Sequence, residues 1–286
     1  MSEKVLFYTL VFGNKSYFLQ TQLLMMSLLH HRPSNAVFRI YTDEPDFFSF
    51  LQDSVEIELI SKEYLQMCIN DHNGYVYSSK LDLIRKVAQE KVFAATIFLD
   101  TDIVALQPLE SFVDELSHGN FFMYKKEKSY SRESRKEYWE ALNRINTLGY
   151  RLDRDSSQWN SGVVGLKGDC LKRLDDAASI MDQLHEAKVQ QHTLEQVAFS
   201  IVLEDTGKLK AAQDWFVHYH PNKPAWEPMA NELEALKQQA CTLPDLIKWF
   251  ASIQTFPSES PPKPDVFTKV IRKWKHSIKK RIRFFS

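Results

Sequence analysis

The chain has 286 residues, of which 44% are hydrophobic and 26% are charged. This length and composition are ordinary for a globular α/β protein with a large core, and they exclude a disordered chain. The net charge is −1, but residues 265–286 hold eight Lys or Arg and one Asp, which leaves about −8 for the rest. A body of that charge argues against nucleic-acid binding.

The cysteines and the N-terminal residues bear on the cellular compartment. Cys68, Cys170 and Cys241 lie far apart and in no metal-ligand spacing, which fits a reducing compartment. The first 13 residues have too short an apolar run and too little basic flank for a signal peptide. No run of about 18 apolar residues is available for a membrane span. The sequence therefore predicts a cytoplasmic protein.

Strands and a helix are predicted before residue 60. Residues 5–12 form a nearly continuous apolar run, which is typical of a buried parallel strand. The apolar residues of 16–31 fit one broad helical face, and further strands are predicted at 36–41 and 55–60. A strand, a helix and a strand in this order predict a right-handed crossover unit of an α/β fold.

The strand predicted at 96–99 ends in Asp100-Thr101-Asp102, and a helix predicted up to residue 90 leads into it. Carboxylates at positions i and i+2 at the end of an extended segment point roughly the same way, so one hard divalent cation can bridge them. Ligands bind at this edge of open α/β sheets. The pattern therefore predicts a metal site, with an ordinary polar loop as the alternative.

Beyond residue 108 the predicted elements are more varied. They are, in chain order, a strand at 120–124, a charged helical excursion or flap at 125–159, a turn into a buried strand at 159–166, helices at 172–188 and 194–203, and a strand at 214–219. Pro221 and Pro224 stand so close that the following loop, HYHPNKPAW, is expected to be irregular. A helical region at 231–250, a Pro/Ser-rich linker at 256–264 and a basic helix at 266–285 complete the chain.

Three separated features suit one kind of site. Asp100 and Asp102 offer oxygen ligands, His218 or His220 offers a nitrogen ligand, and Lys223 offers a positive charge for a phosphate. Mn²⁺ or Mg²⁺ fits that mixture. Such a cation beside a diphosphate stabilises a departing nucleoside diphosphate. A proline-rich connector without any site is the alternative for the histidine loop.

Five motifs in order, between about residues 5 and 226, resemble glycosyltransferase family 8, which includes glycogenin and bacterial lipopolysaccharide galactosyltransferases. They are YTLVFGNKSYFLQ, FLDTDIVALQPL, WNSGVVGL, EQVAF and HYHPNKPAW. The resemblance implies an α/β GT-A fold, Rossmann-like, with a mixed central sheet and a C-terminal helical extension. It also implies a metal-dependent, retaining enzyme that moves a hexose from a UDP-sugar to a hydroxyl acceptor, such as a cell-surface glycan or a lipid-linked saccharide.

The roles of the family's metal ligands carry over to Asp100, Asp102 and His218. His220 is the alternative to His218, because HYHPNKPAW lacks the glycine of the usual HxxGxxKPW motif and is one residue shorter before the lysine. Lys223 is then implied to contact the diphosphate.

The resemblance also implies residues around the donor. Glu195 is implied to touch the hydroxyls of the donor sugar, although the family commonly has Asp there, and Gln196 to lie near the reacting carbon. Asn160 matches an Asn-x-Gly turn beside the sugar. Nucleotide contact is implied for the start of the chain, with Tyr17 stacking on uracil. A basic residue of the helix before the acidic strand is implied to lie near the donor sugar, with Lys80 preferred over Arg85. The implied donor-site residues outside the catalytic and metal sets are Thr9, Val11, Asn14, Tyr17, Lys80, Thr101 and Gly162.

The tail at 266–286 is amphipathic, with apolar residues every three to four positions among the basic ones. Such a helix is expected to bind an anionic membrane surface, which predicts a peripheral protein on the inner face of the plasma membrane. Docking of the helix on the acidic body is the alternative. The predicted division is a catalytic domain at 1–230, a helical extension at 231–256, and a Pro-rich linker with the membrane-associating helix at 257–286.

Two other functions fit part of the sequence. The segment DTDIV fits the D-x-D-x-[TV] pattern of haloacid-dehalogenase-like phosphatases, which leaves WNSGVVGL and HYHPNKPAW unexplained. A catalytically inactive membrane adaptor is disfavoured, because both aspartates, a histidine and the lysine are present.

Overall fold

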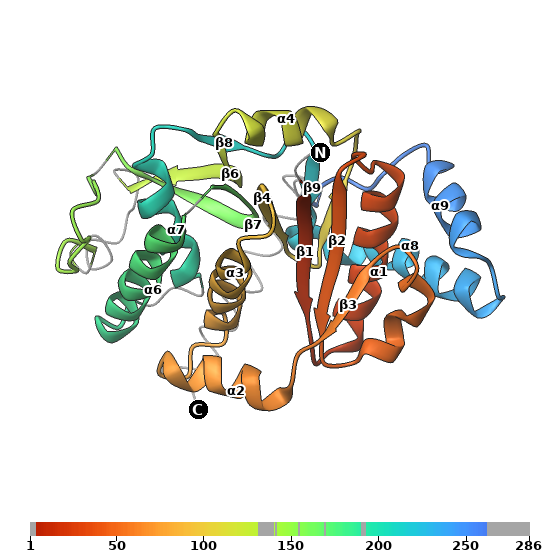
Figure 1. Cartoon of the computed structure of the whole chain (residues 1–286), viewed down its shortest axis with the longest axis horizontal. Helices are drawn as coiled ribbons and strands as arrows, with labels where there is room; N and C mark the ends of the chain where they lie inside the picture. Colours follow the sequence, from red (N-terminus) through yellow and green to blue (C-terminus); the bar gives the residue numbers. More distant parts are fainter. Residues whose placement is uncertain are drawn as a thin grey trace, which may run out of the picture.

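The structure, a computed structural model, describes residues 4–130, 140, 142–153, 155–168, 170–189 and 193–261. In this part of the chain, helices lie on both sides of a central sheet (Figure 1). Every helix in the described ranges is too short or too polar to cross a membrane. The basic helix predicted at 266–285 lies outside the described residues.

The elements follow the predicted alternation of strands and helices. The strands are β1 (Val5–Val11), β2 (Ala36–Thr42), β3 (Glu56–Leu59), β4 (Ala95–Leu99), β5 (Ile103–Ala105), β6 (Phe121–Ser129), β7 (Ser157–Lys167), β8 (Leu209–Ala211) and β9 (Phe216–His218). The helices are α1 (Lys15–His30), η1 (Pro45–Leu51), α2 (Lys62–Asp71), α3 (Ser78–Glu90), α4 (Glu110–Ser117), α6 (Leu171–Glu186), α7 (Leu194–Glu204), η3 (His220–Asn222), α8 (Lys223–Gln238) and α9 (Leu243–Ala251).

The main sheet is mixed. Its strand order is β3-β2-β1-β4-β7-β6-β8. Strands β3, β2, β1 and β4 are parallel to one another, whereas β7 runs antiparallel to both β4 and β6. This confirms the predicted α/β class with a mixed central sheet, and it confirms the crossover from β1 through α1 to β2.

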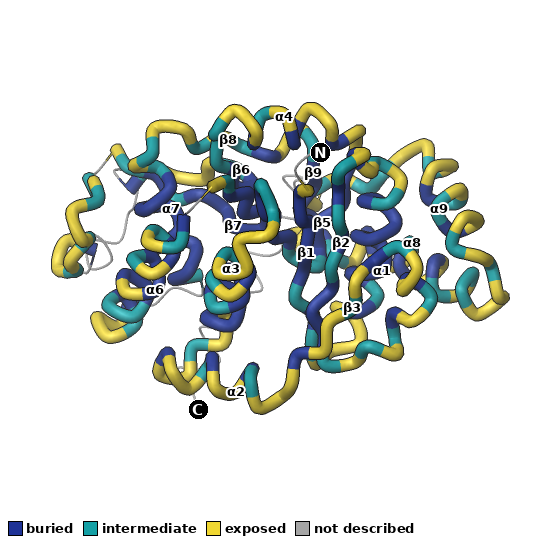
Figure 2. Tube along the Cα trace, in the orientation of Figure 1, coloured by how far each residue is buried: buried dark blue, intermediate teal, exposed yellow. Residues whose placement is uncertain are grey.

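The sheet is buried on both faces, which explains the continuous apolar run of β1. Val5, Phe7 and Val11 face the core that α1, α8 and α9 cover. Leu6 and Tyr8 face the opposite core, which α3, α6 and α7 cover. Figure 2 shows the strands at the centre as buried and the outer sides of the helices as exposed. Parallel strands with helices on both faces place the carboxyl ends of β1 and β4 at one edge.

The prediction of a helical excursion or flap at 125–159 is wrong for the first and last residues of that segment. Residues 125–129 extend β6, and residues 157–159 begin β7, with Lys126 opposite Trp159 and Ser129 opposite Ser157. The buried strand expected within 159–166 is confirmed, but the turn expected to lead into it is wrong, because β7 already begins at Ser157 and runs through these residues. Hydrogen bonding between the two strands satisfies this backbone, so a charged composition on the exposed side of β6 does not prevent a strand.

The irregular loop expected at Pro221 and Pro224 is wrong as well. Pro221 lies in η3, and Pro224 lies in the first turn of α8, where a backbone N–H has no helical partner in any case. The helical region expected at 231–250 is two helices, α8 and α9. A capping box of Thr242 and Asp245 begins α9.

His72 joins three helices. It follows α2, its Nδ1 lies 2.5 Å from Asp182 Oδ1 of α6, and its Nε2 lies 3.2 Å from Asp82 Oδ2 of α3. Hydrogen bonds to Asp182 and Asp82 raise the pKa of His72 to about 9. Because the folded state holds the proton more tightly, the stabilisation is complete below the unfolded pKa of about 6.5 and is lost as the pH rises through about 9.

We therefore expect His72→Gln to lower the free energy of unfolding by about 1 to 2 kcal/mol at pH 6, a value discounted for the partial exposure of Asp182. Most of this loss should disappear at pH 10. Urea unfolding at the two pH values measures the difference. The matched control is His118→Gln, since His118 is exposed and its ring contacts the Asp114 carbonyl. A pH-independent loss in His72→Gln would contradict the assignment.

Candidate functional site

The acidic turn joins β4 to β5. The N–H of Asp100 donates to the Gly162 carbonyl of β7 at 2.8 Å, and the N–H of Ile103 donates back to the Asp100 carbonyl at 3.2 Å. Strand β5 then pairs antiparallel with β9, with Ile103 opposite His218. This small sheet brings His218 beside Asp102, although 116 positions separate them in the sequence.

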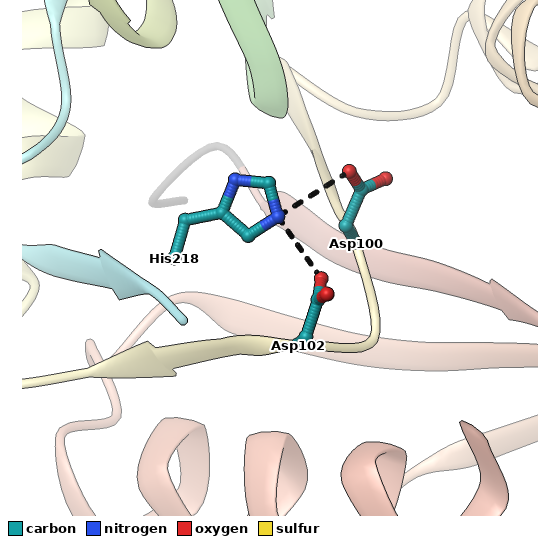
Figure 3. A group of neighbouring side chains, drawn as sticks. All are labelled: Asp100, Asp102 and His218. Atoms are coloured by element: carbon teal, nitrogen blue, oxygen red, sulfur yellow. Dashed lines mark hydrogen bonds and ion pairs between the residues drawn. The ribbon is translucent and has the colours of Figure 1, made fainter. Parts of the chain in front are cut away.

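Figure 3 shows that one ring nitrogen of His218 faces both carboxylates. Its Nε2 lies 3.0 Å from Asp102 Oδ1 and 3.9 Å from Asp100 Oδ2. One ligand atom of each residue lies within 4.8 Å of the other two. Two carboxylates and an imidazole suit a divalent cation such as Mn²⁺ or Mg²⁺. The residues present therefore fit the predicted metal.

The second nitrogen of His218 is also fixed. Asn160 Oδ1 accepts a hydrogen bond from the Gly162 N–H at 2.9 Å and lies 2.9 Å from His218 Nδ1. Because Oδ1 can only accept, Nδ1 carries the proton of this contact, which leaves Nε2, on the side of the carboxylates, as the nitrogen that can bind a ligand. Metal-binding histidines commonly have their outer N–H held in this way. Gly162 makes the approach possible, since a Cβ there would lie 2.5 Å from His218 Nδ1.

His220 is not in this group. Its ring centroid lies 4.9 Å from that of His218, and its side chain is exposed at the cleft. Burial of part of the ring, followed by the nearby His218, lowers the pKa of His220. Of the two histidines left open by the sequence, His218 is the one grouped with the carboxylates.

Lys80 of α3 supplies a fixed positive charge. Its Nζ donates to Asp100 Oδ1 at 2.8 Å, to the Ser161 carbonyl at 2.6 Å and to Ser161 Oγ at 3.1 Å. The ammonium also lies 4.9 Å from the centre of the Phe98 ring. All three N–H groups therefore have partners, and only 9% of the side chain is exposed. Arg85, the other basic candidate on this helix, pairs with Asp82 and Asp175.

Lys223 supplies a second positive charge from the first turn of α8. Its Nζ lies 2.8 Å from Asp102 Oδ2 and 5.3 Å from the centre of the Tyr17 ring. Burial raises the pKa of the Asp102 carboxyl, but His218 and Lys223 lower it by more, and the net pKa is well below the usual range. Asp102 is therefore ionised at neutral pH.

These groups line a cleft of about 560 Å³. The predicted residues that line it are Val11, Tyr17, Lys80, Asp100, Thr101, Asp102, Asn160, Glu195, Gln196, His218, His220 and Lys223. Thr9 is fully buried within β1 and lies outside this lining. Asn14 is exposed and caps α1 by accepting from the Ser16 N–H at 2.9 Å. Nucleotide contact by Thr9 and Asn14 stays a prediction.

Glu195 and Gln196 occupy the first turn of α7 and are buried, rather than lying on the outer surface as most helical Glu-Gln pairs do. The Tyr75 hydroxyl donates to Glu195 Oε2 at 2.5 Å, and burial raises the pKa of the Glu195 carboxyl. Gln196 Oε1 accepts from the Ser161 N–H at 3.2 Å. The strand that carries Asn160 therefore also holds the amide of Gln196.

Sequence reasoning missed Glu127. This residue lies on β6, and its carboxylate accepts from Asn160 Nδ2 at 3.2 Å and from Gln196 Nε2 at 3.3 Å. Glu127 thus connects the two amide side chains of the site. It falls in the segment that was expected to be a helical excursion, and only the correct pairing of β6 with β7 would have pointed to it.

The last described residues return to the start of α8. The Ser258 carbonyl accepts from Asn222 Nδ2 at 2.8 Å and from Trp226 Nε1 at 3.4 Å. The Phe256 ring stacks on Trp226, with centroids 5.8 Å apart. Residues 256–258 therefore support the helix turn that carries Lys223.

No family model and no curated protein sequence matches this chain. Solved structures do. Mouse xyloside xylosyltransferase 1, in its apo form, is 13% identical with a TM-score of 0.50, over 73% of this chain and 84% of that chain. The galactosyltransferase LgtC, in complex with donor and acceptor sugar analogues, is 12% identical with a TM-score of 0.53, over 89% of this chain and 98% of that chain. Likeness at this identity shows the fold, and the chain therefore has the GT-A fold that the motifs implied.

Proposed function

We propose that this protein is a metal-dependent glycosyltransferase of the family 8 type. It moves a hexose from a UDP-sugar to a hydroxyl acceptor with retention of configuration. The observation that carries the proposal is the group of Asp100, Asp102 and His218 at the carboxyl edge of β4, inside the cleft of a GT-A fold. A xylosyltransferase and a galactosyltransferase, according to their names, share that fold.

The ligands of the cation are Asp100, Asp102 and His218 Nε2. A divalent cation held there, Mn²⁺ or Mg²⁺, stabilises the negative charge of the departing nucleoside diphosphate. Lys223 lies at the exposed side of the same group and offers a second positive charge to the phosphates. Lys80, which is fixed by its hydrogen bonds to the Ser161 carbonyl and hydroxyl, holds the Asp100 carboxylate in place through a third hydrogen bond.

The rest of the cleft divides between nucleotide and sugar. Tyr17 is 42% exposed and lies near Lys223, where its ring can stack on uracil. Glu195, Gln196 and Asn160 line the cleft with carboxylate and amide groups that suit sugar hydroxyls. The acceptor hydroxyl then attacks from the face that the leaving diphosphate occupies.

The acceptor is a cell-surface glycan or a lipid-linked saccharide, as in lipopolysaccharide biosynthesis. The support for this part of the proposal is the basic, amphipathic sequence of residues 266–286, which suits an anionic membrane surface. The enzyme then works in the cytoplasm, peripheral to the inner face of the plasma membrane. Residues 1–230 form the catalytic domain, 231–256 its helical extension, and 257–286 the linker and membrane helix.

Neither competing function gains support from the site. The aspartyl-phosphate mechanism of a haloacid-dehalogenase-like phosphatase gives no role to His218, whose imidazole faces both carboxylates. An inactive adaptor leaves unexplained why the three ligand residues and two lysines meet in one cleft.

Calorimetry with UDP tests the proposal. We expect UDP to bind at least about tenfold more tightly with Mn²⁺ than with EDTA, because the cation screens the diphosphate from the two carboxylates. GDP is the control for the base. A screen of UDP-hexoses should then find a donor that is hydrolysed only with the metal. A protein that binds Mn²⁺ but shows no preference for any nucleoside diphosphate would contradict the proposed function.

A further inference from the structure

Each carboxylate of the metal group already has a lysine partner. Asp100 Oδ1 contacts Lys80 Nζ at 2.8 Å, and Asp102 Oδ2 contacts Lys223 Nζ at 2.8 Å. The other oxygen of Asp102 faces His218 Nε2 at 3.0 Å. Both oxygens of Asp102 are therefore engaged, and two ammonium groups balance the charges of the two carboxylates. A cation that binds here must compete with these contacts.

The two lysines differ in how firmly they are held. Lys80 has three oxygen acceptors, and 9% of its side chain is exposed. Among the described residues, Lys223 contacts one carboxylate oxygen and the Tyr17 ring, and 37% of its side chain is exposed. If Lys80 left its acceptors, its buried ammonium group would lose its partners, which is energetically costly. Lys223 is more exposed, and its side chain can rotate into the cleft that it lines.

We propose that Lys223 exchanges partners during donor binding: it pairs with Asp102 before the cation binds, and it pairs with a phosphate of the nucleoside diphosphate afterwards. This inference rests on the proposed function. A divalent cation held by Asp102 repels the ammonium, and the diphosphate offers that ammonium an anionic partner on the open side of the cleft. Lys223 thus couples the binding of the cation to the binding of the nucleotide.

The exchange has a thermodynamic consequence. With Lys223 on Asp102, the cation binds more weakly than the three ligands alone would allow. A nucleotide that draws Lys223 away removes this competition, so cation and nucleotide each strengthen the binding of the other by the same factor. A lysine that served only to bind phosphate would have no effect on the binding of Mn²⁺ alone.

Calorimetric titration with Mn²⁺, without nucleotide, tests this directly. We expect Lys223→Met to bind Mn²⁺ about tenfold more tightly than the unmodified protein. Lys223→Arg, which keeps the charge, should resemble the unmodified protein. Lys210→Met is the matched control, because Lys210 also pairs with a carboxylate, Glu115, at 2.7 Å but lies outside the cleft lining. It should leave the Mn²⁺ affinity unchanged.

A second titration measures the coupling. Saturating UDP should strengthen Mn²⁺ binding at least about tenfold in the unmodified protein and by a several-fold smaller factor in Lys223→Met, where the attraction between the cation and the diphosphate remains but the competition from Lys223 is absent. Circular dichroism and thermal melting confirm that the variants fold. Equal or weaker binding of Mn²⁺ by Lys223→Met, in a folded protein, would overturn the exchange and make Lys223 a fixed part of the metal site. Absence of UDP binding by the unmodified protein overturns the proposed function instead, and the titration with Mn²⁺ alone distinguishes the two failures.

Discussion

Asp102→Asn is expected to abolish measurable Mn²⁺ binding and to reduce metal-dependent turnover by more than about 1,000-fold. Asp102 has 8% of its side chain exposed, and it contacts His218 Nε2 on one oxygen and Lys223 Nζ on the other. An amide removes the negative charge that the cation requires, and its NH₂ group faces one of two positive or donor groups. Little space is available for the side chain to reorient.

Two measurements check this expectation: calorimetric titration with Mn²⁺, and hydrolysis of the donor found by the screen. Asp100→Asn should behave similarly. Asp175→Asn is the control, because it makes the same chemical change at a half-exposed carboxylate that pairs with Arg85. Near-normal donor hydrolysis by Asp100→Asn or Asp102→Asn would show that the acidic turn is not required for the reaction.

Gly162→Ala is expected to lower the affinity for Mn²⁺ by about 100-fold while the protein still folds. The added Cβ would lie 2.5 Å from His218 Nδ1 and 3.1 Å from Asn160 Oδ1, closer than packed atoms allow. The ring of His218 packs edge-on against Tyr124, with centroids 5.3 Å apart, so moving the ring disturbs its alignment with the carboxylates. We expect overpacking to reduce the free energy of unfolding by about 1 to 3 kcal/mol.

Gly165→Ala on the same strand provides a matched control. A Cβ there would lie 3.1 Å from Phe122 Cβ and 3.3 Å from Leu116 Cδ2, which are core atoms away from the histidine. This variant should lose stability and keep its affinity for Mn²⁺. If Gly162→Ala binds Mn²⁺ as tightly as Gly165→Ala does, the position of His218 is not important for the metal, and His218 is not a ligand.

The parts of the fold that the sequence predicted well are those in which one local pattern decides the outcome. β1 and β4 are buried on both faces, so nearly every side chain is apolar. Both strands can therefore be recognised in the sequence as short apolar runs. The polar residues that follow β4 mark its carboxyl end without any knowledge of the neighbouring strands. The motif EQVAF then supplied Glu195 and Gln196, and the family resemblance supplied Lys80; no local pattern would have selected these three residues.

The parts that could not be predicted depend on contacts between distant segments. His218 and His220 are two positions apart, and a strand would place both on the same face. They are separated because β9 ends at His218, opposite Ile103 of β5, and His220 begins η3. The hydrogen bond between His218 and Asn160 joins residues 58 positions apart. The charged composition of residues 125–129 did not predict a strand, because their conformation depends on pairing with β7.

The support that residues 256–258 give to the start of α8 determines where the chain can be shortened. A truncation after Pro261 would remove the basic tail and leave the Ser258 carbonyl with its two donors. A truncation before Phe256 would also remove the ring that stacks on Trp226 and would free the Asn222 amide beside Lys223. Loss of activity in the shorter form could therefore be mistaken for loss of membrane attachment, so tail function should be studied with the cut placed after residue 261.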